Sequence, residues 1–213
     1  MANPERSYSS TVRADQARQT RKRIVDAGAA LFAERGYGAT TIEAIAEAAG
    51  VSRKTVFDSV GGKANLMKLA YDFAITGDDA PVPLMDRSRI TDLMDERDPA
   101  ALIAAHAALV TEVGSRIAGI YCALEQAAGT DAEARALYQA LVRQRRTSMD
   151  VPARGMAEAG ARGRGLTRAQ VADLLWIYSD PALYDKLVGQ QGWSAKQFET
   201  WLRRTLDQQL LEP

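Results

Sequence analysis

A short run of hydroxyl and cationic side chains, Ser52 to Thr55, carries the clearest chemistry in this sequence. Arg53 and Lys54 offer N–H donors of the kind that bind the N7 and O6 acceptors of guanine. The Ser52 and Thr55 hydroxyls, together with backbone N–H groups at a helix start, suit phosphate oxygens instead. These residue types in this order favour a helix whose first turn enters the major groove of DNA.

The residues before this run have the spacing that a helix-turn-helix requires, at about 41–60. Ala46 is a small residue in the first helix, Gly50 follows four positions later in the turn, and Val56 is apolar in the second helix. The same spacing also occurs in generic helix hairpins. A basic arm adds context, because residues 1–25 carry six Arg or Lys and two Asp or Glu, a net charge of 6 − 2 = +4.

The elements that must position these residues are all helical, because apolar residues recur at helical spacing and strand patterns are nearly absent. We predict capping boxes at Thr40/Glu43, Thr130/Glu133, Thr167/Gln170 and Ser194/Gln197. Residues 77–99 are predicted to form a connection with at most one short helix. Helices are predicted at about 15–35, 41–48, 52–59, 63–76, 98–128, 130–159, 167–178, 181–188 and 194–211.

Composition sets the broad class of this chain of 213 residues. Its apolar content of 46% is ample for a buried core, and its formal net charge is zero. The single cysteine, Cys122, excludes an internal disulfide and any multi-cysteine zinc site. The polar start of the chain does not resemble a secretory signal, and no apolar run approaches the roughly 20 residues that span a bilayer. We therefore expect a cytoplasmic protein with no membrane partner and no cofactor.

Residues 21–67, RKRIVDAGAALFAERGYGATTIEAIAEAAGVSRKTVFDSVGGKANLM, closely resemble the DNA-binding domain of TetR-family transcription regulators. The positions that match the family pattern are Ala27, Leu31, Phe32, Gly36, Tyr37, Thr40, Thr41, Ile45, Ala46, Gly50, Val51, Ser52, Thr55 and Lys63. The resemblance implies a homodimer that binds a palindromic operator on double-stranded DNA, usually as a repressor. It also implies a divergent C-terminal body in which a small-molecule effector, of unknown identity, changes the spacing of the two DNA-binding domains.

On this basis we predict a three-helix DNA-binding domain at 15–62 and an effector-binding and dimerisation domain at 63–213. The predicted DNA contacts are Arg21, Thr40, Thr41, Ser52, Arg53, Lys54, Thr55, Phe57 and Lys63. Three departures from the family pattern fall at contact positions. Phe57, Ser59 and Val60 stand where the family usually has a tyrosine, a histidine and an aromatic residue. Asp58 adds a negative charge near the expected phosphates, which predicts weaker phosphate affinity.

The sensing body allows prediction only from residue types, since effector cavities combine apolar walls with a few polar groups. The predicted effector-binding residues are His106, Tyr121, Cys122, Tyr138 and Met149, with contributions from Met67, Tyr71, Met85 and Met94. Ordinary core packing is the alternative for each of them. The predicted dimer interface comprises Leu174, Leu175, Tyr178, Phe198, Trp201, Leu202 and Leu206; alternatively these side chains only close their own domain.

Two other functional classes are alternatives to a DNA-binding regulator. Against an enzyme, the sequence contains no HExxH, CxxC, GxGxxG or GxxxxGK[ST] motif. A Cys122/His106 nucleophile pair is disfavoured because sixteen residues separate the two by about 24 Å along a continuous helix. The second alternative is a protein that keeps the fold but has weak or lost DNA binding and acts through protein contacts. Phe57, Asp58 and Ser59 support it, and activation instead of repression also stays open.

Overall fold

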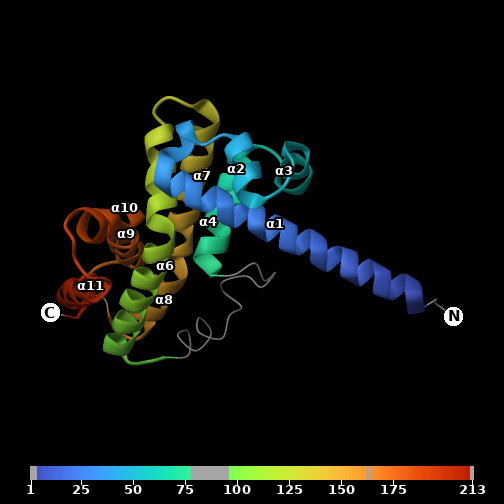
Figure 1. The fold of residues 1–213 in the computed structure, drawn as a ribbon. Coiled ribbons are helices and arrows are strands. Elements are labelled where there is room, and N and C mark those ends of the chain that lie inside the picture. The colour runs from blue at the N-terminus through green and yellow to red at the C-terminus, as the bar shows by residue number, and fades with distance from the viewer. Residues whose placement is uncertain (1–3, 78–95, 162, 164, 212–213) are drawn as a thin grey trace.

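The computed structural model describes residues 4–77, 96–161, 163 and 165–211, and every regular element within these ranges is helical. The all-α prediction is therefore confirmed. Figure 1 shows a tall helical body beside a smaller N-terminal group from which one long helix projects. The helices are α1 (Pro4–Ala39), α2 (Ile42–Ala49), α3 (Arg53–Val60), α4 (Lys63–Thr76), α6 (Pro99–Ala127), α7 (Ala132–Ser148), α8 (Asp150–Glu158), α9 (Arg168–Tyr178), α10 (Pro181–Tyr184), the π-helix η2 (Asp185–Gln190) and α11 (Ala195–Leu210).

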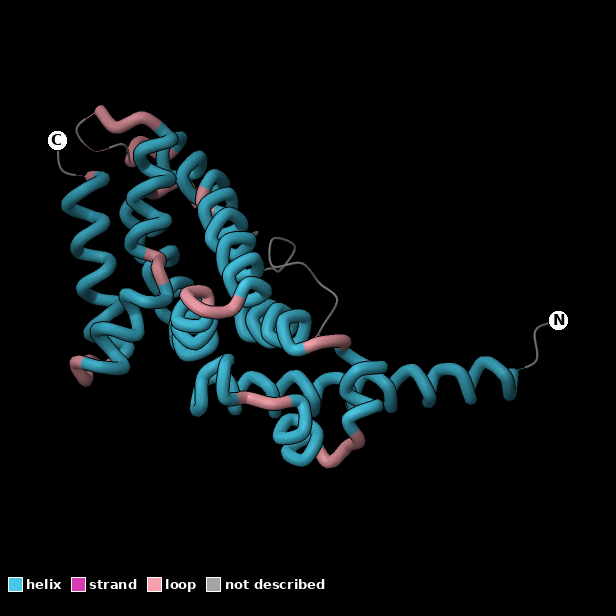
Figure 2. Tube along the Cα trace, turned by 90° about the horizontal axis from the view of Figure 1, so that it is seen from above, coloured by secondary structure: helices cyan, strands magenta, loops and turns pink. Residues whose placement is uncertain are grey.

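The first helix, α1, starts well before the predicted residue 15 and runs as a straight arm away from the body (Figures 1 and 2). Its side chains from Arg13 to Gln19 are exposed, whereas Ile24, Val25 and Phe32 further along are buried. Near residue 35, where the sequence predicts that this helix ends, α1 has a kink at Gly36 with φ of +78° and then continues to Ala39. Glycine fits this position because residues with a Cβ rarely adopt that conformation.

The predicted helix-turn-helix forms from α2 and α3. Ile45, Ala46 and Val56 are buried between the helices, and Gly50 makes the turn with φ of +65°. Ser52 begins α3 as expected, its hydroxyl accepting a hydrogen bond from the Thr55 amide. The start of α2 differs from the prediction, because the capping residue is Thr41, which accepts from the Ala44 amide at 3.1 Å.

The capping boxes at Thr167/Gln170 and Ser194/Gln197 are both present, and they begin α9 and α11 where predicted. The box predicted at Thr130/Glu133 is wrong, since Asp131 caps α7 by accepting from the Ala134 amide. The single helix predicted to reach residue 159 is also wrong. It is divided at Met149 into α7 and α8.

Helix α6 is the central element of the body, with α1, α4, α10 and α11 packed around it. Asp98 caps its start and Pro99 occupies its first turn, as predicted. With 29 residues and a best mean hydropathy of 1.3, α6 is long and apolar enough to cross a membrane by length and composition. Half of that stretch is buried inside the protein, which is the situation of a core helix.

Two apolar cores lie along the molecule. The first core joins α1–α4 to the C-terminal half of α6 and to α7, through residues such as Phe32, Met67, Ile120 and Leu141. The second core joins the N-terminal part of α6 to α8, α9 and α11, through residues such as Ile103, Leu175 and Phe198. The helix-turn-helix is therefore packed against the body through a shared core. The predicted boundary between residues 62 and 63 stays a prediction.

Candidate functional site

The outer face of α3 presents the side chains that the sequence singled out. Ser52, Arg53 and Lys54 are exposed at its first turn, and Thr55 is half-buried beside them. Phe57 is 48% exposed, which makes it one of the few large apolar side chains open to water among the described residues. The opposite face is buried through Val56 and Val60. Packing of that face thus turns the hydroxyls, the cations and the aromatic ring outward together.

Both cations on this face have an acidic partner. The Arg53 guanidinium lies 2.9 Å from the Glu43 carboxylate of α2, and the Lys54 ammonium pairs with Asp58 one turn along α3. All four side chains are more than half exposed. Ion pairs between exposed groups contribute only about 0–1 kcal/mol, so a phosphate or a base edge can displace the carboxylates.

The remaining predicted DNA contacts are placed differently. Arg21 and Thr41 are exposed, on the arm of α1 and at the start of α2. Lys63 is half-buried, with its ammonium donating to the Tyr37 carbonyl at 2.9 Å and lying 4.2 Å from the centre of the Tyr37 ring. The prediction that Thr40 contacts DNA is wrong, because this residue is only 1% exposed. Its hydroxyl donates to the Leu31 and Gly36 carbonyls of α1. Thr40 therefore joins α1 to α2 and has no surface for DNA.

A partly open cavity of about 140 Å³ lies in the body among α4, α6, α7 and the α9–α10 junction. Of the predicted effector-binding residues, His106 and Met149 line it, whereas Tyr121, Cys122 and Tyr138 do not. Tyr71 also lines it, Met67 is fully buried elsewhere in the first core, and Met85 and Met94 lie outside the described residues. The apolar wall is formed by Ile75, Leu109, Val110, Val113, Ile117 and Met149.

His106 lies on the α6 wall of this cavity and is uncharged at neutral pH. Burial lowers its pKa to about 4, because the low-dielectric interior disfavours the imidazolium. Its Nε2 lies 3.2 Å from the Ser179 hydroxyl, at the end of α9. The histidine thus ties α6 to α9 through a neutral hydrogen bond.

Arg145 is the charged centre of the cavity wall, and it is only 10% exposed. One terminal nitrogen donates to the Asp180 carboxylate and the Tyr121 hydroxyl, both at 3.1 Å. The other donates to the Trp176 and Ser179 carbonyls at the end of α9. Asp180 also accepts from the Ala182 amide at the start of α10, so both members of the pair are committed to the protein. Arg145 was not predicted from the sequence, because nothing in the sequence indicates that α7 faces α9 at this point.

Cys122 and Tyr138 lie outside the lining of this cavity. Burial is the main cause that raises the pKa of the Cys122 thiol to about 12, so the thiolate needed for nucleophilic chemistry is disfavoured. The Tyr138 hydroxyl donates to Glu125 at 2.7 Å. The described residues contain no cluster of three or more His, Cys, Asp or Glu that could hold a metal ion.

The predicted dimer interface divides into two sets. Leu175, Phe198, Leu202 and Leu206 have no exposed surface and pack in the second core, so they close their own domain and cannot touch a partner directly. Leu174, Tyr178 and Trp201 are half-buried on the outside of α9 and α11. Ile177, which the sequence analysis missed, is 52% exposed on the same part of α9.

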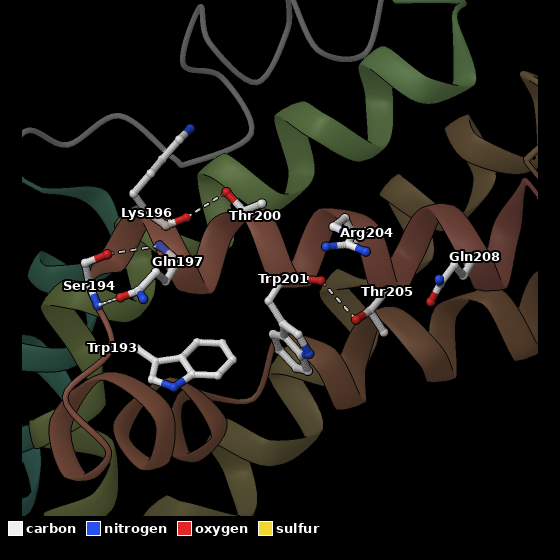
Figure 3. Close-up of a pocket in the computed structure, with 9 residues that line it drawn as sticks. All are labelled: Trp193, Ser194, Lys196, Gln197, Thr200, Trp201, Arg204, Thr205 and Gln208. Atoms are coloured by element: carbon white, nitrogen blue, oxygen red, sulfur yellow. Dashed lines mark hydrogen bonds between the residues drawn. The ribbon is translucent and has the colours of Figure 1, made fainter.

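A surface groove runs along α11 and its leading turn (Figure 3). The Trp193 and Trp201 rings meet edge to face there, with centroids 6.2 Å apart, and the Tyr178 ring of α9 also meets Trp201 edge to face. Arg204, Thr205 and Gln208 continue the groove along the helix. Exposed aromatic and aliphatic surface of this kind is typical of protein–protein contacts.

Comparison with known proteins finds one similar family and several similar structures. Residues 24–70 match the family model described as bacterial regulatory proteins, tetR family. No curated protein matches the chain. The match confirms the resemblance of these residues to the tetR family that the sequence indicated, and the chain as a whole shares its fold with solved transcriptional regulators.

Solved structures support the same fold over most of the chain. A Saccharomonospora viridis protein assigned as a transcriptional regulator, in complex with choline, is 17% identical, with a TM-score of 0.66 over 90% of this chain and 97% of its own. The regulator FadR from Bacillus subtilis, in complex with stearoyl-CoA, is 16% identical, with a TM-score of 0.66 over 87% and 96%. A Syntrophomonas wolfei protein assigned to the TetR family is 14% identical, with a TM-score of 0.67 over 89% and 93%.

Proposed function

We propose that this protein is a homodimeric transcription regulator that binds a palindromic operator and is released from it by a small-molecule effector, acting as a repressor in the cytoplasm. The observation that carries the proposal is the outward face of α3, where Ser52, Arg53, Lys54 and Phe57 are exposed together on a TetR-family helix-turn-helix. Such a second helix enters the major groove and reads base edges with its first residues.

Most of the predicted DNA contacts, although not the buried Thr40, have surroundings that favour a particular role. Arg53 and Lys54 exchange their carboxylate partners for base edges or phosphates, while Ser52, Thr55 and the exposed Thr41 contact phosphate oxygens at helix starts. Lys63 has its ammonium held on Tyr37 and is oriented toward the DNA backbone by that contact. Arg21 adds positive charge from the arm of α1, which projects beyond the domain (Figure 1).

Dimerisation through the outer faces of α9 and α11 supplies the second DNA-binding domain that a palindrome requires. The exposed side chain of Ile177 and the partly exposed Leu174, Tyr178 and Trp201 support this interface. Burial of such surface on association is favourable. We propose that these four residues, with the groove along α11, contact the partner copy.

The effector is proposed to bind the cavity among α4, α6, α7 and α10. The similar structures hold choline and stearoyl-CoA, which differ greatly in size, so they support sensing of a small molecule without indicating which one. Helix α4 leads directly out of the helix-turn-helix and forms one wall through Tyr71 and Ile75. A ligand that displaces α4 therefore changes the separation of the two DNA-binding domains.

Selection of bound sequences from a random duplex pool tests the DNA-binding role. The wild type should enrich a palindrome, and the double variant Arg53→Ala/Lys54→Ala should lose that enrichment, because the groove-facing donors are gone. A matched control, Arg154→Ala/Arg168→Ala, removes two exposed cations from α8 and α9 and should select the same palindrome as the wild type. Absence of enrichment by the wild type at low salt would contradict the proposal and favour a relative that acts through protein contacts alone.

The dimer is tested by light scattering after size exclusion. Ile177→Glu places a charge on the exposed part of α9 and should shift the protein from dimer to monomer. Ala136→Glu, at an exposed position of α7, is the matched control and should stay dimeric. A wild-type monomer, or a dimer that tolerates Ile177→Glu unchanged, would move the interface away from α9.

A further inference from the structure

Residues 13–23 of α1, the arm segment, form a length of helix that the rest of the described chain leaves open to solvent. Every side chain at 13–19 and 21–23 is exposed, and the first buried residues of α1 are Ile24 and Val25. Short helices are only marginally stable alone, so the arm segment depends on its continuity with the packed part of α1. It presents its whole surface to solvent or to a partner.

The arm segment is strongly basic. It contains five cations and one carboxylate, a net charge of 5 − 1 = +4, in a chain whose formal net charge is zero. The rest of the chain therefore carries 0 − 4 = −4. The carboxylate is Asp15, and the cations are Arg13, Arg18, Arg21, Lys22 and Arg23. This separation of charge favours the approach of a polyanion to the arm segment rather than to the body.

The cations of the arm segment are accessible to such a polyanion. Arg18, Arg21 and Lys22 lie three and four positions apart, so they share one side of the helix. The Lys22 ammonium pairs with Asp26 at 2.6 Å, and both of these side chains are about half exposed. Ion pairs between exposed groups contribute little to stability, so phosphate oxygens can displace the Asp26 carboxylate.

The arm segment lacks the apolar stripe with which a helix binds a groove on another protein. Between residues 13 and 20 the only apolar side chains are Ala14 and Ala17. Helices that dock into protein grooves use larger apolar residues at helical spacing. Duplex DNA requires no such stripe, because cations on a polar surface bind its phosphates and release counterions. The composition of the arm segment therefore favours DNA over a protein partner.

The direction of the arm decides which part of the duplex it meets. Helix α1 packs against both α2 and α3, so the arm is held in a fixed direction relative to the DNA-binding face. In both views the arm projects on the side of the molecule opposite to α9 and α11 (Figures 1 and 2). Because α9 and α11 form the proposed dimer interface, the arm points away from the partner copy. It is thereby directed toward the outer end of each half-site.

We propose that the arm segment lies along the duplex outside each half-site and binds its phosphates without reading sequence. At a rise of about 1.5 Å per residue the segment is about 15 Å long, which corresponds to about four base pairs. Phosphate contacts add affinity and fix orientation but carry no sequence information. This inference rests on the proposed function, because only an operator has flanks, and it adds a second DNA-binding element outside the helix-turn-helix.

Two duplexes test the arm segment once the palindrome has been selected. The short duplex ends at the palindrome, and the long one continues for about one helical turn on each side. Fluorescence anisotropy should show that the wild type binds the long duplex roughly tenfold more tightly at low salt, whatever the flanking sequence. Salt should weaken binding to the long duplex more steeply, because each phosphate contact adds about 0.9 to the slope.

Arg13→Gln/Arg18→Gln removes two charges from each arm segment and introduces residues that favour a helix. The variant should lose most of the advantage of the long duplex. Its salt slope there should fall by about 3 to 4, since the dimer loses four contacts. The matched control, Arg154→Gln/Arg168→Gln, makes the same charge change at exposed positions of the body and should keep the full advantage.

Hydroxyl-radical footprinting of the long duplex tests the position of the arm segment directly. Protection should extend past both ends of the palindrome with the wild type and the control, and should be shorter with Arg13→Gln/Arg18→Gln. Three results would each overturn the inference. They are equal affinity of the wild type for both duplexes, equal losses in the variant and the control, and extra protection between the half-sites.

Failure of this inference is distinguishable from failure of the proposed function. A wild type that selects a palindrome but binds both duplexes equally keeps its role as a DNA-binding regulator and loses only the arm contact. A wild type that selects no palindrome loses both. Operator selection and the ratio of the two affinities are separate measurements, so each claim has its own outcome.

Discussion

Arginine has opposite uses in two regions of this molecule. Arg53 on α3 is 62% exposed and pairs with the similarly accessible carboxylate of Glu43. Arg145 on α7 is 10% exposed and donates to a carboxylate, a hydroxyl and two carbonyls. An exposed pair opens easily, whereas a buried one does not. The first arginine is therefore free to exchange partners with DNA, and the second holds α7 against α9 and α10.

The largest expected effect comes from removing the buried arginine. Arg145→Ala should lower the free energy of unfolding by about 3 kcal/mol, because Asp180 and the carbonyls at the end of α9 lose their donor. Urea denaturation measures it. Its neighbour Arg146, which is more exposed and pairs with Asp150 and Asp173, is the matched control and should lose less than about 1 kcal/mol on change to alanine. Equal losses would remove the distinction between buried and exposed arginine.

Lowering the pH should destabilise the protein through a second buried group of the cavity wall, His106. The pKa of His106 is lowered to about 4, whereas in the unfolded chain it has its usual value near 6.5, so the unfolded state binds the proton first as pH falls. Stability is thus greatest above pH 6.5 and declines toward pH 4. We expect a loss of about 2 kcal/mol between pH 7.5 and pH 5 from this residue.

Because His106 is the only histidine in the chain, the variant His106→Gln isolates this effect. Urea denaturation across that range should show a flatter pH dependence for the variant than for the wild type. A wild type whose stability is constant from pH 7.5 to pH 5.5 would show that His106 is solvated rather than buried.

On the DNA-binding side, Arg53→Ala should weaken binding to the selected operator by about tenfold, the lower part of the range for an arginine that contacts a base. Stability should hardly change, since only an exposed ion pair is lost. Fluorescence anisotropy at two salt concentrations measures the affinity. Arg203→Ala, at an exposed position of α11, serves as the control, and an equal effect there would reduce the role of Arg53 to general charge.

The smallest expected effect is a gain. Asp58→Asn removes the carboxylate that pairs with Lys54 and also a negative charge near the phosphates. Affinity for the operator should rise by roughly two- to threefold at low salt, and the difference should shrink as salt increases. Anisotropy with the same duplex checks it. A weaker complex would indicate that Asp58 accepts a hydrogen bond from a base, such as the amino group of cytosine.

The helices whose ends were predicted best are those whose first residues form a capping box with near neighbours in the sequence. The Thr167 and Ser194 capping boxes mark α9 and α11 because cap, turn and first apolar residue lie within a few positions. Where two threonines are adjacent, local pattern alone misassigned the cap, and burial of Thr40 against α1 decided between them. The break between α7 and α8 has no glycine, and the proline that follows sits inside α8.

The candidate sites, like the helix ends, could be predicted only where local sequence pattern determines the structure. The exposed face of α3 was predictable, since a helix-turn-helix motif fixes which residues point outward. The cavity was predicted only in part, because its wall combines residues from α4, α6, α7 and α10 whose pairing depends on tertiary packing. Arg145 looks like one of several arginines on a polar helix until α9 is placed beside it. Sequence spacing also could not separate the interior leucines of α9 and α11 from their exposed neighbour Ile177.

The apolar core that joins α1–α4 to the C-terminal half of α6 and to α7 has a practical consequence for protein engineering. A chimera that joins residues 1–62 to the body of another regulator would leave Ile24, Phe32 and Ile45 beside side chains that never co-evolved with them. Grafting a new specificity onto this protein is therefore better done on the outer face of α3 than by exchange of the whole domain. The exposed positions proposed to read DNA can be replaced one at a time, and the packed core beneath them then stays unchanged.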